Sequence, residues 1–246
     1  MPEHIVHTAE GGILYEPSLC SKPMHELFEF RYWLEQQLAT ETVGGRGQVL
    51  FIRDHDRHWV LRHYRRGGLI AKFVVDRYVW RGAAATRSFR EFRLLQQLVK
   101  YELPVPIPIA ARYVQAGGSY RADLITQEIS GACSLAACLR DAPLTIAQWQ
   151  EVGHVLARFH ALGVQHADLN AHNIVFDVDN AVYVLDFDRG CLCTPQRRWI
   201  DKVLARLLRS LNKLHAQDDI HFSQTDWQYL QAAHDEQLRR LRVKQT

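Results

Sequence analysis

The sequence predicts an α+β fold of two lobes: an N-terminal lobe of mostly antiparallel sheet with one main helix, and a mainly helical C-terminal lobe. Two observations predict it. The first half alternates short apolar runs with turn residues around one helical segment, and the second half repeats apolar residues at helical spacing. The change falls near residues 126–131, so we expect one lobe over residues 1–128 and the other over residues 129–246.

The first half contains two hairpin patterns with a helical pattern between them. Residues 48–53 and 59–64 are apolar runs joined by a polar turn, which predicts a β-hairpin. Residues 111–115 and 120–126, joined across two glycines, predict a second hairpin. Between the hairpins, apolar residues at helical spacing predict a helix over residues 83–100. These apolar positions are Phe89, Phe92, Leu95 and Val99.

The second half opens with a helix signal at Thr145. A Gln stands three residues after this Thr, as in a capping box, and Gly163 supplies a stop for the helix. Residues 174–177 and 182–187 are short apolar runs across a turn and predict two strands. From Pro195 onward the pattern predicts two amphipathic helices.

The 246-residue chain has the composition of a globular protein, with 47% hydrophobic and 23% charged residues. It has no apolar run of the roughly eighteen residues that a spanning helix needs. The first ten residues lack the basic start and apolar centre of a secretory signal. The five cysteines are odd in number and irregularly spaced, which argues against a disulfide framework or a structural zinc site. We therefore expect the chain to stay in the compartment where it is made.

One loop concentrates the residue types that phosphoryl transfer requires. It has the pattern H-x-D-x-x-x-x-N from His166 to Asn173, and Asp186 follows on the next hairpin. Transfer from Mg-ATP needs a carboxylate that accepts the proton of the incoming hydroxyl, and hard oxygen ligands that hold metal on the phosphates. Asp168, Asn173 and Asp186 have the order and spacing that supply both.

This loop resembles the catalytic and metal-binding loops of the protein-kinase-like superfamily. Two further strings, Trp59–Gly68 and Ser88–Leu95, resemble one branch more narrowly. That branch is the 3-deoxy-D-manno-octulosonic acid (Kdo) kinases, which are related to the lipopolysaccharide heptose kinases. The resemblance covers most of the chain and implies an ATP-binding N-terminal lobe and a catalytic C-terminal lobe.

The resemblance also implies roles for individual residues. Asp168 would accept the proton from the sugar hydroxyl, Asn173 and Asp186 would bind Mg²⁺, and His166 would support the loop. Glu91 would pair with a basic residue of the third strand. Two sets would contact ATP: glycines over the phosphates and a segment beside adenine. They are Gly44, Gly45 and Gly47, and Gln127, Glu128 and Ile129.

The sequence departs from the superfamily pattern at two places. The position expected to hold a phosphate-binding Lys is Arg62, and Arg binds phosphate with a different geometry from Lys. Lys72 also lies in an apolar, strand-like run, so it remains the alternative to Arg62. Asp188 stands where the superfamily's D-F-G loop has Gly, which reduces backbone freedom and leaves the metal-binding role of Asp186 intact.

The chain after Asp186 favours a compact acceptor over a protein substrate. Protein kinases place a long activation segment with an Ala-Pro-Glu motif here, whereas in this sequence a helical pattern resumes by about residue 197. Residues 53–93 carry eleven Lys or Arg against four Asp or Glu, which suits an acidic acceptor. The resemblance implies the 4-hydroxyl of Kdo on a lipid A precursor, Kdo-lipid IV(A).

Because that acceptor is lipid-anchored, we expect peripheral contact with an anionic membrane surface at the cytoplasmic side of the bacterial inner membrane. We expect neither nucleic acid nor an obligate protein partner. The basic helix over residues 198–214 has two interpretations: its apolar side lies on a membrane, or it is a core helix of the second lobe. The pattern favours the core helix.

Other functions share the same loop. A small atypical protein kinase or an aminoglycoside-type phosphotransferase would also have H-x-D-x-x-x-x-N, and the basic first lobe argues against both. A kinase fold without activity, serving as a binding module, is a third alternative that Arg62 and Asp188 favour. The intact set of Asp168, Asn173 and Asp186 argues against it.

Overall fold

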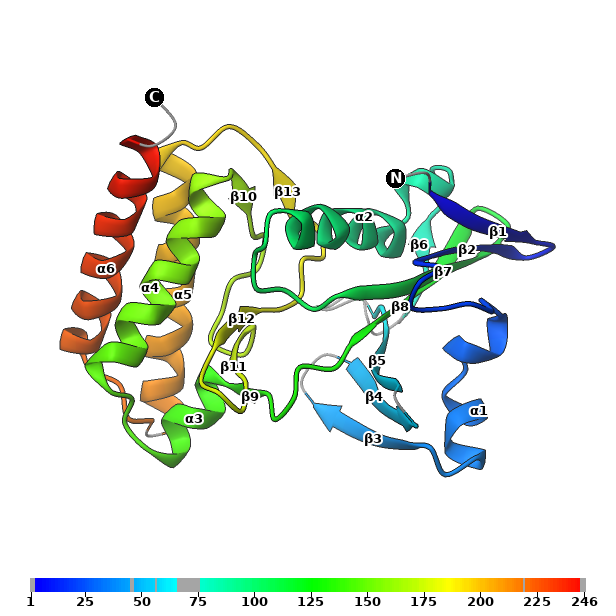
Figure 1. Cartoon of the computed structure of the whole chain (residues 1–246), viewed down its shortest axis with the longest axis horizontal. Coiled ribbons are helices and arrows are strands. Elements are labelled where there is room, and N and C mark those ends of the chain that lie inside the picture. The colour runs from blue at the N-terminus through cyan, green and yellow to red at the C-terminus, as the bar shows by residue number, and fades with distance from the viewer. Residues whose placement is uncertain (1–2, 45–46, 56, 66–75, 219, 244–246) are drawn as a thin grey trace. The chain divides into compact units, whose positions relative to one another are not determined.

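The computed structural model describes residues 3–44, 47–55, 57–65, 76–218 and 220–243, and it has the α+β architecture that the sequence predicts (Figure 1). The chain divides into two compact units. The first unit comprises Met1–Gln97 and Pro106–Glu128, and the second comprises Leu98–Val105 and Ile129–Thr246.

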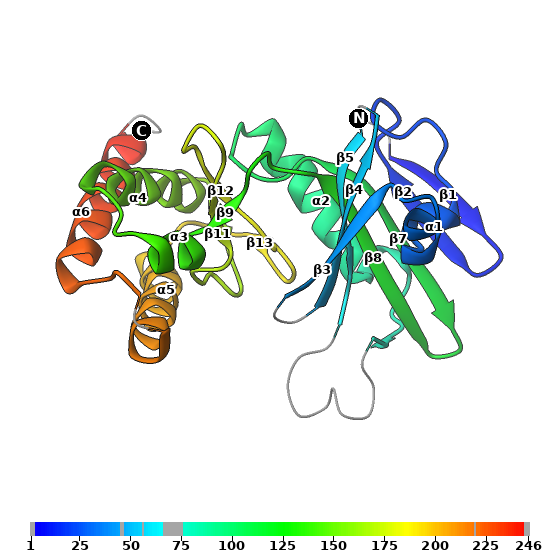
Figure 2. The same ribbon diagram turned by 90° about the horizontal axis from the view of Figure 1, so that it is seen from below.

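The first unit is built on an eight-stranded antiparallel sheet in the described part of the chain. Its order is β1-β2-β7-β8-β5-β4-β3, with β6 paired to β8, and Figure 2 shows β3, β4, β5, β8 and β7 following one another across the sheet. Both predicted hairpins are present, as β4–β5 and β7–β8. The strands are β1 (His4–Thr8), β2 (Gly11–Tyr15), β3 (Ala39–Gly44), β4 (Gly47–Asp54), β5 (Arg57–His63), β6 (Tyr78–Val79), β7 (Pro108–Ala116) and β8 (Ser119–Gln127).

The main helix of the first unit, α2 (Arg87–Lys100), begins four residues later than the predicted start at Ala83. A 3-10 turn, η3 (Ala83–Ala85), precedes it, and Thr86 is extended with φ −65° and ψ 146°. The Thr86 carbonyl accepts the first helical bond from Arg90 N at 3.0 Å, so Thr86 is the boundary residue. The helix buries Phe89 and Phe92 fully, and Phe89 packs edge-on against Tyr113 of β7.

The N-terminal segment forms elements that no clear sequence pattern predicts. β1 and β2 make a hairpin that joins the sheet edge at β7, and η1 (His25–Phe28) and α1 (Phe30–Glu35) follow. A Cβ at Gly11 would lie 2.0 Å from the carbonyl oxygen of Tyr113, so this strand contact requires glycine. Trp33 is 1% exposed in the hydrophobic core and donates its indole N–H to the Leu27 carbonyl at 2.9 Å.

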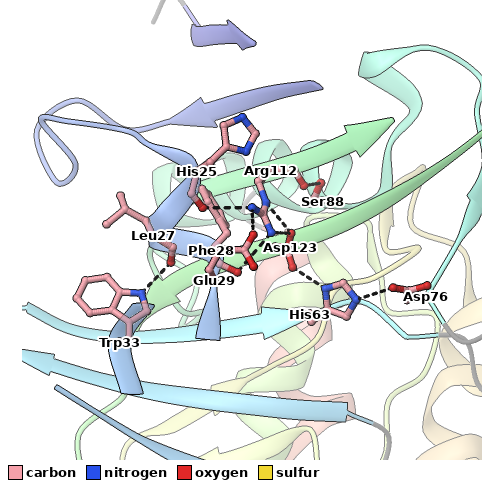
Figure 3. Close-up of polar contacts among 10 residues, drawn as sticks. All are labelled: His25, Leu27, Phe28, Glu29, Trp33, His63, Asp76, Ser88, Arg112 and Asp123. Atoms are coloured by element: carbon pink, nitrogen blue, oxygen red, sulfur yellow. Dashed lines mark hydrogen bonds and ion pairs between the residues drawn. The ribbon is translucent and has the colours of Figure 1, made fainter. Parts of the chain in front are cut away.

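A buried polar network connects this N-terminal segment to the middle of the sheet (Figure 3). Arg112 of β7 donates to Asp123 of β8 at 2.9 Å and to Glu29 at 2.5 Å. Asp123, which is 1% exposed, also contacts His63 Nδ1 at 2.6 Å, and His63 Nε2 lies 3.5 Å from Asp76. Because each charge in this network has an opposite neighbour, the network joins four sequence-distant segments without an isolated buried charge.

The network predicts a pH dependence of stability that originates at His63. Burial by itself lowers the pKa of His63, but hydrogen bonding and charge from Asp123, together with Asp76, outweigh burial and raise the pKa. A group whose pKa is raised by folding stabilises the folded protein. This contribution is fully present at pH values below the pKa of the unfolded state, about 6.5, and it is lost as pH rises through the pKa of the folded state. We therefore measure the free energy of unfolding by urea titration at several pH values between about 6 and 9. As pH rises, this free energy should fall more for the wild-type protein than for His63→Gln. Parallel pH profiles for the two proteins would contradict this assignment.

The second unit is mainly helical, as predicted, and its long helices are α4 (Ile146–Ala161), α5 (Arg197–Asp218) and α6 (Gln224–Val243). Helices α4 and α6 lie side by side (Figures 1 and 2). Thr145 and Gln148 form the predicted capping box at the start of α4. The predicted strand pair is present, and both strands begin where predicted. The first ends one residue early, at Phe176, and the second ends three residues early, at Val184. The remaining elements are α3 (Leu135–Asp141), β9 (Cys133–Ser134), β10 (Val164–Gln165), β11 (Ile174–Phe176), β12 (Val182–Val184) and β13 (Cys191–Leu192).

Helices α4 and α6 approach closely because Gly153 has no side chain. A Cβ at Gly153 would lie 2.3 Å from the Leu230 carbonyl oxygen. Two turns further along α4, His160 Nδ1 lies 2.8 Å from His234 Nε2. Burial, followed by the nearby charge of His234, lowers the pKa of His160 to about 3, so this ring is neutral at physiological pH.

The apolar side of α5 lies in the protein core. Trp199, Ile200, Val203, Leu207, Leu211 and Leu214 are all buried. The favoured interpretation of this segment as a core helix is therefore confirmed, and its apolar side is not a membrane-facing surface. Among the described residues, no helix combines the length and apolar character needed to cross a membrane.

Candidate active site

The catalytic loop predicted from the sequence lies in the second unit between β10 and β11, and His166 anchors it. His166 is 5% exposed; its Nδ1 accepts the backbone N–H of Asp168 at 3.1 Å. Its Nε2 therefore carries the proton and donates to the Leu185 carbonyl at 2.9 Å. Burial is the main cause that lowers the pKa of His166, which keeps the ring neutral in this role. His166 thus ties the segment of Asp168 to the segment of Asp186.

Two asparagine side chains fix the backbone of Asp168. The Nδ2 atoms of Asn170 and Asn173 both donate to the Asp168 carbonyl, each at 3.0 Å. Since a carbonyl accepts only from the amide nitrogen, this contact defines the orientation of the Asn173 side chain. Its Oδ1 is then the oxygen that points away from the loop backbone and can serve as a metal ligand.

Asp168 itself lies beside helix α5. Its Oδ1 accepts a hydrogen bond from Arg206 Nη1 at 3.1 Å, and 39% of the Asp168 side chain is exposed. The neighbouring Ser210 Oγ accepts the backbone N–H of Ala171 at 3.2 Å. Two consecutive turns of α5 therefore hold the loop. Asp168 is oriented by an ion pair and still reachable by a substrate.

Asp186 has the backbone geometry of a constrained functional residue. Its φ is +61°, in the left-handed region where a non-glycine residue is disfavoured by about 1–3 kcal/mol. The neighbours on both sides hold it there. Leu185 N donates to the Asn173 carbonyl at 2.8 Å, and Phe187 is 1% exposed between Phe159 and His166.

The replacement of Gly by Asp at position 188 does not strain this loop. The positive φ values of the described loop residues fall at Asp186 and Arg189, not at Asp188. The turn closes instead through Gly190 N, which donates to the Phe187 carbonyl at 2.7 Å. Asp188 therefore gives no structural support to the inactive-module alternative.

Asn173 and Asp186 fit a divalent cation by the chemistry of their donors. The pairing of Ile174 with Val184 places Asn173 and Leu185 opposite each other at the end of the β11–β12 ladder, so that Asp186 is the next residue along. A carbonyl oxygen with fixed orientation beside a carboxylate is the kind of hard-oxygen pair that Mg²⁺ prefers. Among the described residues, we find no group of three or more His, Cys, Asp or Glu side chains that could hold a metal ion without other ligands.

The first unit contains the pair that the sequence placed at the ATP phosphates. Arg62 of β5 donates to Glu91 of α2 at 2.6 Å, and Glu91 is almost fully buried. Tyr64 O–H donates to the other oxygen of Glu91, and the Arg62 guanidinium lies 4.9 Å from the centre of the Tyr64 ring. Glu91 thus pairs with a strand cation, as expected, while the contact of Arg62 with phosphate stays a prediction. Lys72 lies outside the described residues.

Two of the three predicted phosphate-loop glycines belong to a hairpin. Gly44 ends β3, Gly47 begins β4, and the two residues are register partners. Gly45 lies outside the described residues. The sequence pattern located the turn, but not the strand β3 that precedes it.

The segment predicted beside adenine contains the boundary between the units, which falls after Glu128. Gln127 N donates to the Ile107 carbonyl and Glu128 N to the His58 carbonyl, both at 2.8 Å. The Glu128 carboxylate accepts from Arg53 at 3.0 Å. An adenine contact in this segment, including Ile129, would therefore use backbone groups other than these two N–H groups.

Comparison with known proteins identifies the family. A sequence model described as "Lipopolysaccharide kinase (Kdo/WaaP) family" matches residues 31–234. This chain belongs to the lipopolysaccharide kinase family. Membership confirms the predicted phosphotransferase class, with ATP as donor and a hydroxyl group as acceptor.

Similar proteins carry a more specific name. The 3-deoxy-D-manno-octulosonic acid kinase of Xylella fastidiosa (strain M12) is 41% identical over 92% of this chain and 90% of its own length. The proteins of that name from Stenotrophomonas maltophilia (strain R551-3) and Xanthomonas campestris pv. campestris (strain B100) are 43% and 41% identical over the same shares. These relatives confirm the narrower resemblance to Kdo kinases.

Sequence reasoning missed two residues that hold the catalytic loop of this lipopolysaccharide kinase. Arg206 and Ser210 lie more than thirty positions beyond the loop, and their contacts depend on how α5 docks. The available signal was the helical repeat of basic residues from Arg198 to Lys213. This repeat indicated that one side of the helix is positively charged. It did not indicate that Asp168 lies against that side.

Proposed function

We propose that this protein transfers the γ-phosphate of ATP to a hydroxyl of Kdo in lipopolysaccharide core biosynthesis. The acceptor in this proposal is the 4-hydroxyl of the Kdo residue on Kdo-lipid IV(A). The observation that supports it most is the anchoring of Asp168, Asn173 and Asp186 through His166 and the Asp168 carbonyl. The names of the relatives favour Kdo over other acceptors.

In the proposed reaction Asp168 acts as the base. The Kdo hydroxyl oxygen attacks the γ-phosphorus of ATP, its proton passes to the Asp168 carboxylate, and a new O–P bond forms. The bond between the γ-phosphorus and the β,γ-bridging oxygen breaks, and ADP leaves. Arg206 keeps the Asp168 carboxylate in one orientation through its contact with Oδ1. Phosphoryl transfer depends on such positioning together with electrostatic stabilisation of the phosphoryl group.

Asn173 Oδ1 and the Asp186 carboxylate are the proposed ligands of Mg²⁺, which supplies positive charge that neutralises the phosphate oxygens of ATP. In the first unit, Arg62 is the proposed phosphate-binding cation. Glu91 and Tyr64 fix its position, and a guanidinium presents paired donors that match phosphate oxygens. Gly44, Gly45 and Gly47 are proposed to let the backbone approach the phosphates closely.

We further propose peripheral residence at the cytoplasmic side of the inner membrane. ATP is the donor and the proposed acceptor is a lipid, so the enzyme would meet its substrates at a membrane surface facing the cytoplasm. Anionic headgroups attract basic proteins over about one Debye length, and the chain has a formal net charge of +3.

An acceptor panel with radiolabelled ATP tests the function. The acceptors are Kdo-lipid IV(A), lipid IV(A) without Kdo, an aminoglycoside and a generic protein. We expect label on Kdo-lipid IV(A) alone. Label on the aminoglycoside or on the protein would support one of the alternative kinase classes. Turnover on none of the four acceptors would support the inactive binding module.

A further inference from the structure

Helix α5 carries a stripe of exposed cations on one side. The cations recur at intervals of three or four residues, so all of them fall within an arc of about 80° around the helix axis. We call this set the α5 stripe, and it consists of Arg198, Lys202, Arg206, Arg209 and Lys213. From its first to its last member the stripe extends about 22 Å along the helix.

The stripe passes directly beside the proposed catalytic base. Its middle member, Arg206, contacts Asp168 Oδ1 at 3.1 Å, and Ser210 on the adjoining line of the helix holds Ala171 of the catalytic loop. Because Arg206 contacts the proposed base, the stripe continues along α5 in both directions from the point of phosphoryl transfer. An acceptor that presents its hydroxyl to Asp168 would therefore have its neighbouring groups close to the stripe.

The other four members have no polar partner among the residues that the structure describes. Arg198, Lys202, Arg209 and Lys213 make no hydrogen bond or ion pair within the described part of the chain. The acidic residue among them in sequence, Asp201, lies off the stripe and accepts from Arg197 at 2.7 Å. Like charges at this spacing repel each other, so the stripe is destabilising unless an anion binds along it.

We propose that the α5 stripe binds the phosphate and carboxylate groups of the acceptor glycolipid's headgroup. This inference rests on the proposed function, because it takes Kdo-lipid IV(A) as the acceptor. Kdo contributes a carboxylate and the lipid A portion contributes phosphates, which are anions spread over several sugar units, as the cations are spread along α5. Arginine and lysine both bind such groups, arginine with paired donors.

The stripe favours the acceptor over the bilayer in general. Helices that bind bilayers insert an apolar side next to their cations. The apolar side of α5 is buried, and the described large hydrophobic residues that are exposed all lie on other elements. The stripe can therefore bind a headgroup through electrostatic contacts only. Because Arg206 contacts Asp168, a headgroup bound along the stripe would lie at the proposed site of the reaction.

The test replaces three stripe residues that make no hydrogen bond or ion pair with the catalytic loop. The variant is Lys202→Gln/Arg209→Gln/Lys213→Gln. The matched control, Arg239→Gln/Arg240→Gln/Arg242→Gln, removes the same charge from α6.

Steady-state kinetics are measured with Kdo-lipid IV(A) and with the same acceptor after removal of its lipid A phosphates. Because each exposed ion pair contributes up to about fivefold, we expect the stripe variant to raise the acceptor KM roughly tenfold.

Three further results are expected. For the stripe variant, kcat and the KM for ATP stay within about twofold of wild type, because Asp168 and the ATP contacts are unchanged. The dephosphorylated acceptor shows a clearly smaller rise in KM than the phosphorylated one. The α6 control behaves as wild type with both acceptors. An equal rise in KM for both acceptors, or an unchanged KM for the phosphorylated one, would overturn the proposal.

A sedimentation assay separates this inference from the proposed function. Binding to vesicles that contain Kdo-lipid IV(A) is compared with binding to vesicles of phosphatidylglycerol at equal surface charge. We expect the stripe variant to lose binding to the first and the α6 control to retain it. Equal loss on both vesicles would identify general bilayer binding and reject the acceptor as ligand. Wild-type protein that binds Kdo-lipid IV(A) through the stripe without phosphorylating it would refute the proposed function and leave the headgroup site standing.

Discussion

Replacement of Asp168 by Asn is expected to lower kcat with Kdo-lipid IV(A) by about 10²–10⁴-fold, the range that a general base contributes. The amide has the size of the carboxylate but does not accept the hydroxyl proton. It also replaces the ion pair with Arg206 by a weaker neutral contact. The backbone of residue 168 keeps its contacts with His166, Asn170 and Asn173, so the loop is expected to remain folded.

Asp179→Asn is the matched control for this prediction. Asp179 is exposed in the β11–β12 turn of the same unit, and the substitution removes the same charge. We expect kcat within about twofold of wild type for Asp179→Asn, since exposed charges away from a site contribute little. Activity of Asp168→Asn within tenfold of wild type, with an unchanged thermal midpoint, would contradict the role of Asp168 as base.

Replacement of Asp123 by Leu is expected to destabilise the protein by about 3–5 kcal/mol, because it leaves the buried Arg112 guanidinium without its main counter-charge. Arg112 is 7% exposed and Asp123 is 1% exposed, so water does not compensate. The same substitution removes the carboxylate that raises the pKa of His63. The free energy of unfolding from urea titration measures the effect.

Two further variants make this prediction specific. The double variant Arg112→Met/Asp123→Leu removes both charges and should be more stable than Asp123→Leu alone, since no unpaired buried charge remains. Arg31→Gln breaks an exposed pair with Glu35 and should change stability by less than about 0.5 kcal/mol. If the double variant were as unstable as the sum of the two single changes, the pairing would not be the origin of the effect.

The elements with strong local patterns were predictable from the sequence. The hairpins β4–β5 and β7–β8 and the helices α4, α5 and α6 have periodic apolar residues and clear turn or capping residues. The N-terminal elements lack such patterns. Helix α1 is six residues long, and its stability depends on long-range contacts such as the buried Trp33 in the core. The network through Arg112 likewise depends on strand register, which local spacing does not determine.

The candidate site divides in the same way. His166, Asp168 and Asn173 lie within one loop, so their spacing alone indicated their chemistry. The Arg62–Glu91 pair was expected from family resemblance, and the structure contains it. The contact of Arg206 with Asp168 joins residues 38 positions apart and requires the docked position of α5. The left-handed backbone of Asp186 arises from packing around Phe187, and no residue type in the sequence signals it.

The position of the new phosphate on the product shows whether this protein is a kinase of the Kdo 4-hydroxyl. Kdo-lipid IV(A) is incubated with ATP and the enzyme, and the product is cleaved between Kdo and the lipid A portion and analysed by mass spectrometry and ³¹P NMR. We expect one added phosphate on the Kdo fragment, coupled to the proton at its carbon 4, and no such product with Asp168→Asn. An added phosphate on the lipid A fragment, or a product that forms equally well with Asp168→Asn, would contradict the proposed function.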